Sequence, residues 1–264
     1  MGRIGEKFEY LRARKEKALI VYLTAGDPSL AVTKDLILAL AGAGVDVLEI
    51  GIPFSDPTAD GPVIQAASQR ALQAGATLEG VLQLVAAVRK ISRIPIVLFS
   101  YFNPIFVYGV KKFAQTARRV GVDGVLVVDL PQEEAKELRE HIDPAGLDFI
   151  SLVAPTTSDK RLKSIAAQAT GFLYYISITG VTGTTAPEIG DIKKYIARIR
   201  QSTNMPVVVG FGISTRKQAR EISRFADGVV IGSTLVKLID ENRNNSGLIK
   251  IVADYALGIK DALR

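Results

Sequence analysis

Eight apolar segments recur along the chain at a nearly regular interval, and they constrain its fold more than any other feature. They are rich in valine, isoleucine and leucine and do not alternate with polar residues, so each predicts a strand buried on both faces of a parallel sheet. Seven intervals cover the 210 residues from the first segment to the eighth, so each is about one βα unit long. The segments are 18–24, 45–50, 95–100, 124–129, 149–153, 171–177, 206–210 and 228–232.

The sequences between these segments are helical in pattern, and several begin with a capping residue or a proline, as at Ser158-Asp159 and Ser214-Thr215. Related short motifs with glycine and aspartate stand at four strand entrances, over 43–46, 120–123, 145–148 and 225–228. The units are therefore built alike.

Eight similar units without a linker favour an α/β fold with one closed (β/α)8 barrel, a TIM barrel, as a single domain over residues 1–264. The alternative is an open doubly wound sheet, which usually has fewer strands and often a glycine-rich turn after the first; no G-x-G-x-x-G follows 18–24. We also expect an extra N-terminal helix, a closing helix over 247–263, and long loops after the second and sixth strands, at the catalytic face.

The composition limits the chemistry. The chain has 264 residues, no cysteine and one histidine, so it can form no disulfide, no cysteine nucleophile and no two-histidine metal site. His141 ends a polar helical stretch, where a surface position is expected. Acid–base chemistry must therefore fall to carboxylates, tyrosine or lysine.

Charge and hydropathy limit the partners. The net charge is +6, but the basic residues are scattered along helical stretches and form no run longer than a pair, which disfavours nucleic-acid binding. The N-terminus has no apolar signal core, and nowhere do 18 apolar residues run together. We expect a cytoplasmic protein without a membrane span.

A glutamate stands inside the apolar end of the second predicted strand. A buried carboxylate needs a partner or shifts its pKa upward, so Glu49 is a candidate proton-transfer group, unless it points outward or forms a structural ion pair. Asp60 follows 11 positions later, on a loop close enough in sequence to bend back over the same pocket.

Glycine clusters follow the last strands, at 210–215 and 232–234, and a third lies at 180–185. Glycines let main-chain N–H groups approach a ligand, and a helix that starts there presents its positive end. The clusters predict a phosphate site after the seventh and eighth strands, and hence a phosphorylated small-molecule substrate.

The motifs LEIGIPFSDPTADGPVIQ at 48–65 and YYISITGVTG at 174–183, with the two glycine loops, resemble tryptophan synthase α subunits over nearly the whole chain. The resemblance implies a carbon–carbon lyase of tryptophan biosynthesis that cleaves indole-3-glycerol phosphate to indole and glyceraldehyde 3-phosphate without a cofactor or metal. It also implies an αββα complex in which indole passes to a β subunit. Two departures from the family's pattern are Thr58 and the segment 184–187.

The resemblance also implies roles for site residues. Glu49 is the acid–base group, Asp60 holds the indole N–H, Tyr174 lines the site and Phe211 lies against the indole. Thr182 belongs to a closing loop. The phosphate would be bound by Gly183, Gly212, Gly232 and Ser233.

The residues agree with this chemistry. A retro-aldol cleavage needs an electron sink, and no predicted strand end carries a lysine for a Schiff base, so the substrate must supply the sink. Indole protonated at C3 can accept the bonding electrons. A carboxyl with a raised pKa, Glu49, can protonate C3, and a carboxylate near N1, Asp60, can stabilise the cation.

The sequence leaves two alternative functions open and also predicts a docking surface. A phosphosugar isomerase with Asp129 as its second acid is one alternative, and a weakly catalytic, allosteric binding subunit is another. The first half of the loop 52–62 is apolar and stiffened by proline. We expect it to carry Ile52, Pro53 and Phe54 towards solvent as a docking surface.

Overall fold

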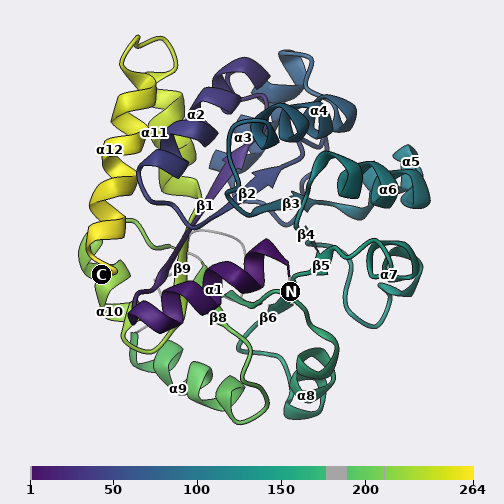
Figure 1. Ribbon diagram of the computed structural model, residues 1–264, viewed down its shortest axis with the longest axis vertical. Coiled ribbons are helices and arrows are strands. Elements are labelled where there is room, and N and C mark those ends of the chain that lie inside the picture. Colours follow the sequence, from purple (N-terminus) through teal and green to yellow (C-terminus); the bar gives the residue numbers. More distant parts are fainter. Residues whose placement is uncertain (1, 177–188, 211) are drawn as a thin grey trace.

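The computed structural model describes residues 2–176, 189–210 and 212–264. Its strands form one parallel sheet at the centre, with helices around it (Figure 1). The strands are β1 (Ala18–Thr24), β2 (Val47–Gly51), β3 (Ile96–Ser100), β4 (Gly124–Val127), β5 (Asp148–Phe149), β6 (Ser151–Val153), β7 (Leu173–Ile176), β8 (Val207–Gly210) and β9 (Gly228–Ile231).

The sheet closes into a barrel. Its order is β5-β4-β3-β2-β1-β9-β8-β7-β6, so β1 lies between β2 and β9. The two end strands, β5 and β6, are separated in sequence only by Ile150, whose N–H donates to the Val125 carbonyl at 2.9 Å. They are two parts of one fifth barrel strand. The predicted eight-stranded (β/α)8 barrel is confirmed, and the predicted segment 149–153 is interrupted at one residue.

Twelve helices lie in the described ranges and pack around the strands (Figure 1). They are α1 (Arg3–Arg14), α2 (Leu30–Gly42), α3 (Pro62–Gln73), α4 (Leu78–Arg89), α5 (Phe102–Tyr108), α6 (Val110–Val120), α7 (Lys136–Ile142), α8 (Asp159–Gln168), α9 (Ile189–Arg200), α10 (Arg216–Ser223), α11 (Ser233–Asn242) and α12 (Leu248–Asp261). The long interval after the second strand holds two helices, α3 and α4. The segment after the sixth predicted strand, 177–188, lies outside the described residues.

The extra helix α1 closes one end of the barrel. Its apolar side buries Ile4, Phe8 and Leu11, and the Phe8 ring lies 5.7 Å from that of Phe172. These side chains share a core with Ala18 and with eight interior residues that lie on, or directly beside, the barrel strands. The interior residues are Ile20, Val47, Val97, Leu126, Ile150, Phe172, Val208 and Val230.

The next interior layer follows from the strand period. Side chains two positions apart on a strand point to the same side, so the positions after this core also face the barrel interior. This layer consists of Tyr22, Glu49, Phe99, Val128, Leu152, Tyr174, Gly210 and Gly232. Its polar members lie on β1, β2 and β7, at the end of the barrel away from α1.

The aspartates of the repeated entrance motif tie neighbouring strands together. Asp46, Asp123 and Asp227 each accept a hydrogen bond at 2.8 Å from the first N–H groups of the preceding strand. Each also pairs with a cation, respectively Lys260, Arg89 and Arg200. No such bond to Asp148, in the fourth motif, is found among the described residues; at the entrance of the following strand Thr170 accepts instead, from the Phe149 N–H at 2.8 Å. Three of the four motifs thus stabilise strand ends.

Membrane-spanning potential is limited in the described ranges. No single helix there is long and apolar enough to cross a bilayer, and the one combination that meets the criteria of length and composition is α3 with α4, which bend by 92° at their junction.

Candidate active site

Glu49 lies inside the barrel, in register with Tyr22 on β1 and Val97 on β3. It is 1% exposed, and neither of its carboxylate oxygens has a hydrogen-bond partner among the described residues. Burial alone raises the pKa of Glu49 to about 8. Glu49 is therefore a protonated acid at neutral pH, and it neither points outward nor forms a structural ion pair with a described residue.

Two tyrosines flank this acid, Tyr22 on β1 and Tyr174 on β7. Burial, and then the charge of Glu49, holds the pKa of Tyr174 well above its usual range. Each tyrosine ring lies directly against a glycine of the next strand, where there is no room for a side chain. A Cβ atom at Gly51 would overlap the Tyr22 ring, and one at Gly210 would overlap the Tyr174 ring. Both phenols stay protonated at neutral pH, so they can donate hydrogen bonds within the site.

Asp60 lies on the loop between β2 and α3, and its N–H donates to the Pro57 carbonyl at 3.1 Å. Burial raises the pKa of Asp60 to about 6, and a hydrogen bond with the Tyr101 side chain opposes that rise. The charges of both Asp60 and Glu49 act on the Tyr22 phenol and raise its pKa further, after burial. The structure therefore brings Glu49 and Asp60 to the same end of the barrel, where both act on the Tyr22 phenol.

The two described glycine loops differ as anion sites. The first turn of α10 is capped by its own Thr215 and Gln218 side chains, which already use the N–H groups of these two residues. The first turn of α11 follows Gly232 and has no side-chain cap, which leaves the N–H groups at Ser233 open to a ligand. Gly212 precedes α10 with φ +71° and is exposed. Of the two helices, α11 is the better phosphate site.

Three residues of the expected site, Thr182, Gly183 and Phe211, lie outside the described residues. The remaining six are Glu49, Asp60, Tyr174, Gly212, Gly232 and Ser233; all of them lie on the strands' carboxyl ends or on the loops that follow. Sequence reasoning did not single out Tyr22 or Tyr101. Tyr22 stands within an apolar run, where a tyrosine is indistinguishable from a core residue.

The expected docking loop is partly wrong. Ile52 and Pro53 are buried, because the Ile52 N–H continues the pairing of β2 with β3 and donates to the Phe99 carbonyl at 2.8 Å. Phe54 is half-buried against Tyr101, with ring centroids 5.3 Å apart. The chain thus leaves the barrel wall later than its apolar, proline-containing sequence predicts.

Asp129, the second acid of the alternative isomerase, is exposed at the end of β4 and accepts a hydrogen bond from the Phe102 N–H at 2.8 Å. It fixes the start of α5. His141 is partly exposed in the last turn of α7, as expected. The described residues contain no group of three or more histidines and carboxylates that could hold a metal ion.

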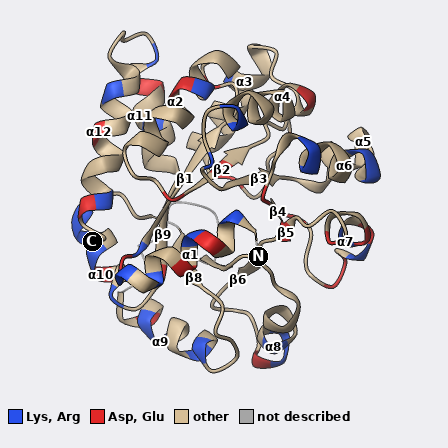
Figure 2. Cartoon of the chain, viewed as in Figure 1, with Lys and Arg blue, Asp and Glu red and all other residues tan. Residues whose placement is uncertain are grey.

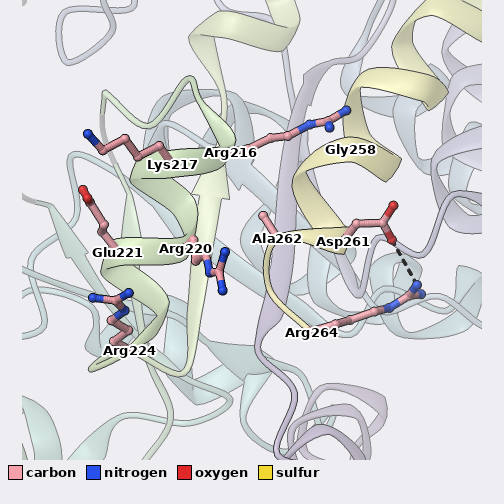
Figure 3. A pocket seen from close by; sticks show the side chains of 9 residues that line it. All are labelled: Arg216, Lys217, Arg220, Glu221, Arg224, Gly258, Asp261, Ala262 and Arg264. Carbon is pink, nitrogen blue, oxygen red and sulfur yellow. Dashed lines mark hydrogen bonds and ion pairs between the residues drawn. The ribbon is translucent and has the colours of Figure 1, made fainter.

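Basic side chains gather on one outer surface. Figure 2 shows Lys and Arg concentrated near α10 and the end of α12. A groove of about 690 Å³ lies between these two helices (Figure 3). Its basic residues are Arg216, Lys217, Arg220, Arg224 and Arg264. The expectation of scattered charge is wrong here, since a spacing of four residues puts three of the arginines along one helix face. None of the site residues above lines this groove.

Comparison with known proteins identifies the family. A model of the tryptophan synthase alpha chain family matches residues 8–262. The tryptophan synthase alpha chain of Citrifermentans bemidjiense is 51% identical over 263 residues, which make up 100% of this chain and 98% of that one. The tryptophan synthase alpha chain of Desulfatibacillum aliphaticivorans is 49% identical over 264 residues, all of both chains.

Solved structures agree with the sequence relatives. The crystal structure of tryptophan synthase subunit alpha from Legionella pneumophila superposes with a TM-score of 0.94 at 38% identity and covers 100% of this chain and 98% of that one. A chain of tryptophan synthase from M. tuberculosis, in an aminoacrylate-bound form, superposes with a TM-score of 0.89 at 31% identity over all of both chains. The chain belongs to the tryptophan synthase alpha chain family and is a lyase that cleaves indole-3-glycerol phosphate by a retro-aldol reaction, with a β subunit as its partner.

Proposed function

We propose that Glu49 and Asp60 divide the proton chemistry of this cleavage between them. The observation that carries the proposal is the separation of their pKa values, about 8 for Glu49 and about 6 for Asp60, at positions that share Tyr22 as a neighbour. Between these two values Glu49 is protonated and Asp60 is ionised. Two carboxyl groups held in opposite protonation states are suited to act as acid and as electrostatic stabiliser.

The reaction then needs no external electron sink. Glu49 gives its proton to C3 of the indole ring, which becomes an indoleninium cation. The bond between C3 and the hydroxyl-bearing carbon of the glycerol chain breaks, and its electron pair returns to the ring. The ionised Glu49 takes the proton of that hydroxyl group as the carbon–oxygen double bond of the aldehyde forms. Each turnover thus restores the Glu49 proton.

Asp60 stabilises the cation in this scheme. A carboxylate near N1 attracts the positive charge as it develops, and this attraction is strong at a buried position because water is excluded. Tyr22 and Tyr174 remain protonated throughout. Their part is to line the pocket and to orient the hydroxyl groups of the substrate.

The phosphate is placed at the first turn of α11, with Gly232 and Ser233, and beside Gly212. The uncapped N–H groups of α11 support this assignment. By family resemblance Gly183 joins the phosphate site, Phe211 lies against the indole and Thr182 belongs to a closing loop. We further infer that residues 1–264 work as one domain, in the cytoplasm, as expected of an enzyme of amino-acid biosynthesis.

The test is the pH dependence of indole release from indole-3-glycerol phosphate by the chain with its β subunit. We expect kcat/KM to follow a bell with an acid limb near pH 6 and a basic limb near pH 8. Glu49→Gln should lose at least about 1,000-fold in kcat while substrate still binds. Near-normal indole release by Glu49→Gln would overturn the assignment of the proton transfers to Glu49.

A further inference from the structure

We propose that Tyr101 is the positioning residue for Asp60: its hydroxyl group and ring hold the Asp60 loop against the end of β3. The inference rests on the proposed function of Asp60. It adds a residue that touches the reaction only through Asp60.

The backbone of Tyr101 is fixed on both sides. Tyr101 follows β3 directly and is the residue before α5. The Ser100 hydroxyl donates to the Tyr101 carbonyl at 2.8 Å, and the next N–H, that of Phe102, donates to Asp129 at 2.8 Å. The residue is 3% exposed. Its side chain therefore leaves the barrel wall from a rigid point.

The side chain contacts the loop at both ends. The Tyr101 hydroxyl accepts a hydrogen bond from the Ala59 N–H at 2.9 Å, and it lowers the pKa of the adjacent Asp60 carboxyl. A phenol can accept one hydrogen bond and donate another, so Tyr101 can bond to Ala59 and still donate to the Asp60 carboxylate. At the loop's other end the ring packs on Phe54, at 5.3 Å between centroids. One residue thus spans the segment 54–60.

Among the described residues, the other hydrogen bonds of segment 54–60 stay within the loop or join it to α3, and none joins it to a barrel strand. The Thr58 N–H donates to the Asp56 carbonyl at 2.9 Å within the loop, and Gln65 of α3 donates to the Asp60 carbonyl at 2.8 Å. Ser55, Asp56 and Thr58 are exposed. Tyr101 instead joins this segment to a barrel strand, and so defines where the Asp60 carboxylate lies relative to Glu49.

The hydroxyl group also affects the charge of Asp60. Its hydrogen bond stabilises the carboxylate and lowers the pKa of Asp60 against the effect of burial. Without the hydroxyl group the pKa of Asp60 rises above about 6. The acid limb of the pH profile of kcat/KM then moves to higher pH. Looser packing around the Tyr101 ring would lower the rate but would not move this limb.

The test uses Tyr101→Phe in the chain with its β subunit. This variant keeps the ring on Phe54 and removes only the hydroxyl group. We expect kcat for indole release to fall about 10- to 100-fold, the range for a hydrogen bond to a charged group, with KM changed less than about threefold. The acid limb should move upward by at least about half a pH unit. Tyr10→Phe is the matched control, because Tyr10 is 55% exposed on α1, at the opposite end of the barrel; it should leave rate and profile unchanged.

A double-variant cycle separates this inference from the proposed function. If Tyr101 acts through Asp60, Tyr101→Phe should cost little further activity in an Asp60→Asn background. Multiplied losses, or an unchanged acid limb in Tyr101→Phe, would overturn the positioning role. Full activity of Asp60→Asn would instead overturn the proposed function. Equal melting temperatures of Tyr101→Phe and the unmodified protein confirm that folding is intact.

Discussion

The Lys260 ammonium group donates to the Asp46 carboxylate at 2.7 Å, and both side chains are nearly fully buried. Lys260 lies near the end of α12, and Asp46 precedes β2, so the bond joins the last helix to the first strands across 214 positions. The Asp46 carboxylate also accepts from the Leu19 N–H, at the start of β1. This one carboxylate therefore links three elements at the end of the barrel that α1 closes.

Removal of this lysine should destabilise the fold strongly. In Lys260→Met the Asp46 charge stays buried with weaker compensation, since Lys7 lies at 3.6 Å. We expect the free energy of unfolding, measured by urea denaturation, to fall by about 3 kcal/mol. Lys250→Met is the matched control on the same helix, because its pair with Asp254 is exposed; it should change stability by less than about 1 kcal/mol. Equal effects of the two changes would contradict the importance of burial.

Glu49 should make the protein less stable as the pH rises. Burial raises its pKa from the usual 4.5 to about 8 in the folded state. The folded protein holds this proton more tightly than the unfolded chain does, so proton binding at Glu49 stabilises the fold. This stabilisation is complete below pH 4.5 and is lost as the pH rises through 8. It amounts to about 1.4 kcal/mol of unfolding free energy per unit of pKa difference. Glu49→Gln has no such proton to lose.

We therefore expect Glu49→Gln to melt close to the unmodified protein at pH 4.5 and clearly above it at pH 9, although the variant is inactive. Differential scanning calorimetry at both pH values measures this. Glu137→Gln, a change at an exposed glutamate of α7, serves as the control and should show no pH-dependent difference. A constant gap between Glu49→Gln and the unmodified protein at all pH values would count against a raised pKa.

The barrel and its central acid are predictable from the sequence because each leaves a local signal. A strand buried on both faces must be apolar throughout, and a carboxylate inside such a strand, Glu49, is conspicuous. Tyr22 and Tyr101 leave no such signal. Whether a tyrosine contributes its ring to a core or its hydroxyl group to a site depends on neighbouring segments that are distant in sequence, such as the loop that places Ala59 beside Tyr101.

The wrong prediction that Ile52 and Pro53 are exposed has a similar cause. Ile52 and Pro53 are apolar both in a strand extension and in an exposed docking loop, so their sequence cannot separate the two. The hydrogen bond from the Ile52 N–H to the Phe99 carbonyl decides it, and that bond depends on the register of β2 with β3. Periodicity predicts which residues form strands, but where pairing stops depends on the partner strand.

The phosphate assignment can be tested at Gly232. A Cβ atom there would meet only the Cβ of Tyr22, at the ordinary contact distance of 3.6 Å, so the fold should tolerate Gly232→Ala. The added methyl group should still hinder the approach of phosphate to α11. We expect KM for indole-3-glycerol phosphate to rise about tenfold or more, with melting temperature unchanged and protection by glycerol phosphate lost.

Gly212→Ala gives a contrasting result. At φ +71° any side chain is strained, so this change should lower stability by about 1 kcal/mol as well as affect binding. If Gly232→Ala leaves KM and ligand protection intact, the phosphate does not bind at α11.

The β subunit should dock beside α5. The side chains of Phe106 and Val107 are 57% and 78% exposed on this helix, which starts directly after Tyr101 at the carboxyl end of β3. Exposed apolar side chains next to a catalytic opening suit a partner that receives the product there.

Phe106→Glu should weaken binding of the β subunit at least about tenfold, because the interface would bury an unpaired charge. Indole release by the isolated chain should stay within about twofold of that of the unmodified protein. Ile91→Glu is the control: Ile91 is 66% exposed just after α4, at the opposite end of the barrel, and its replacement should not affect the complex. Complex mass and affinity by analytical ultracentrifugation measure both variants, and unimpaired binding by Phe106→Glu would exclude α5 from the interface.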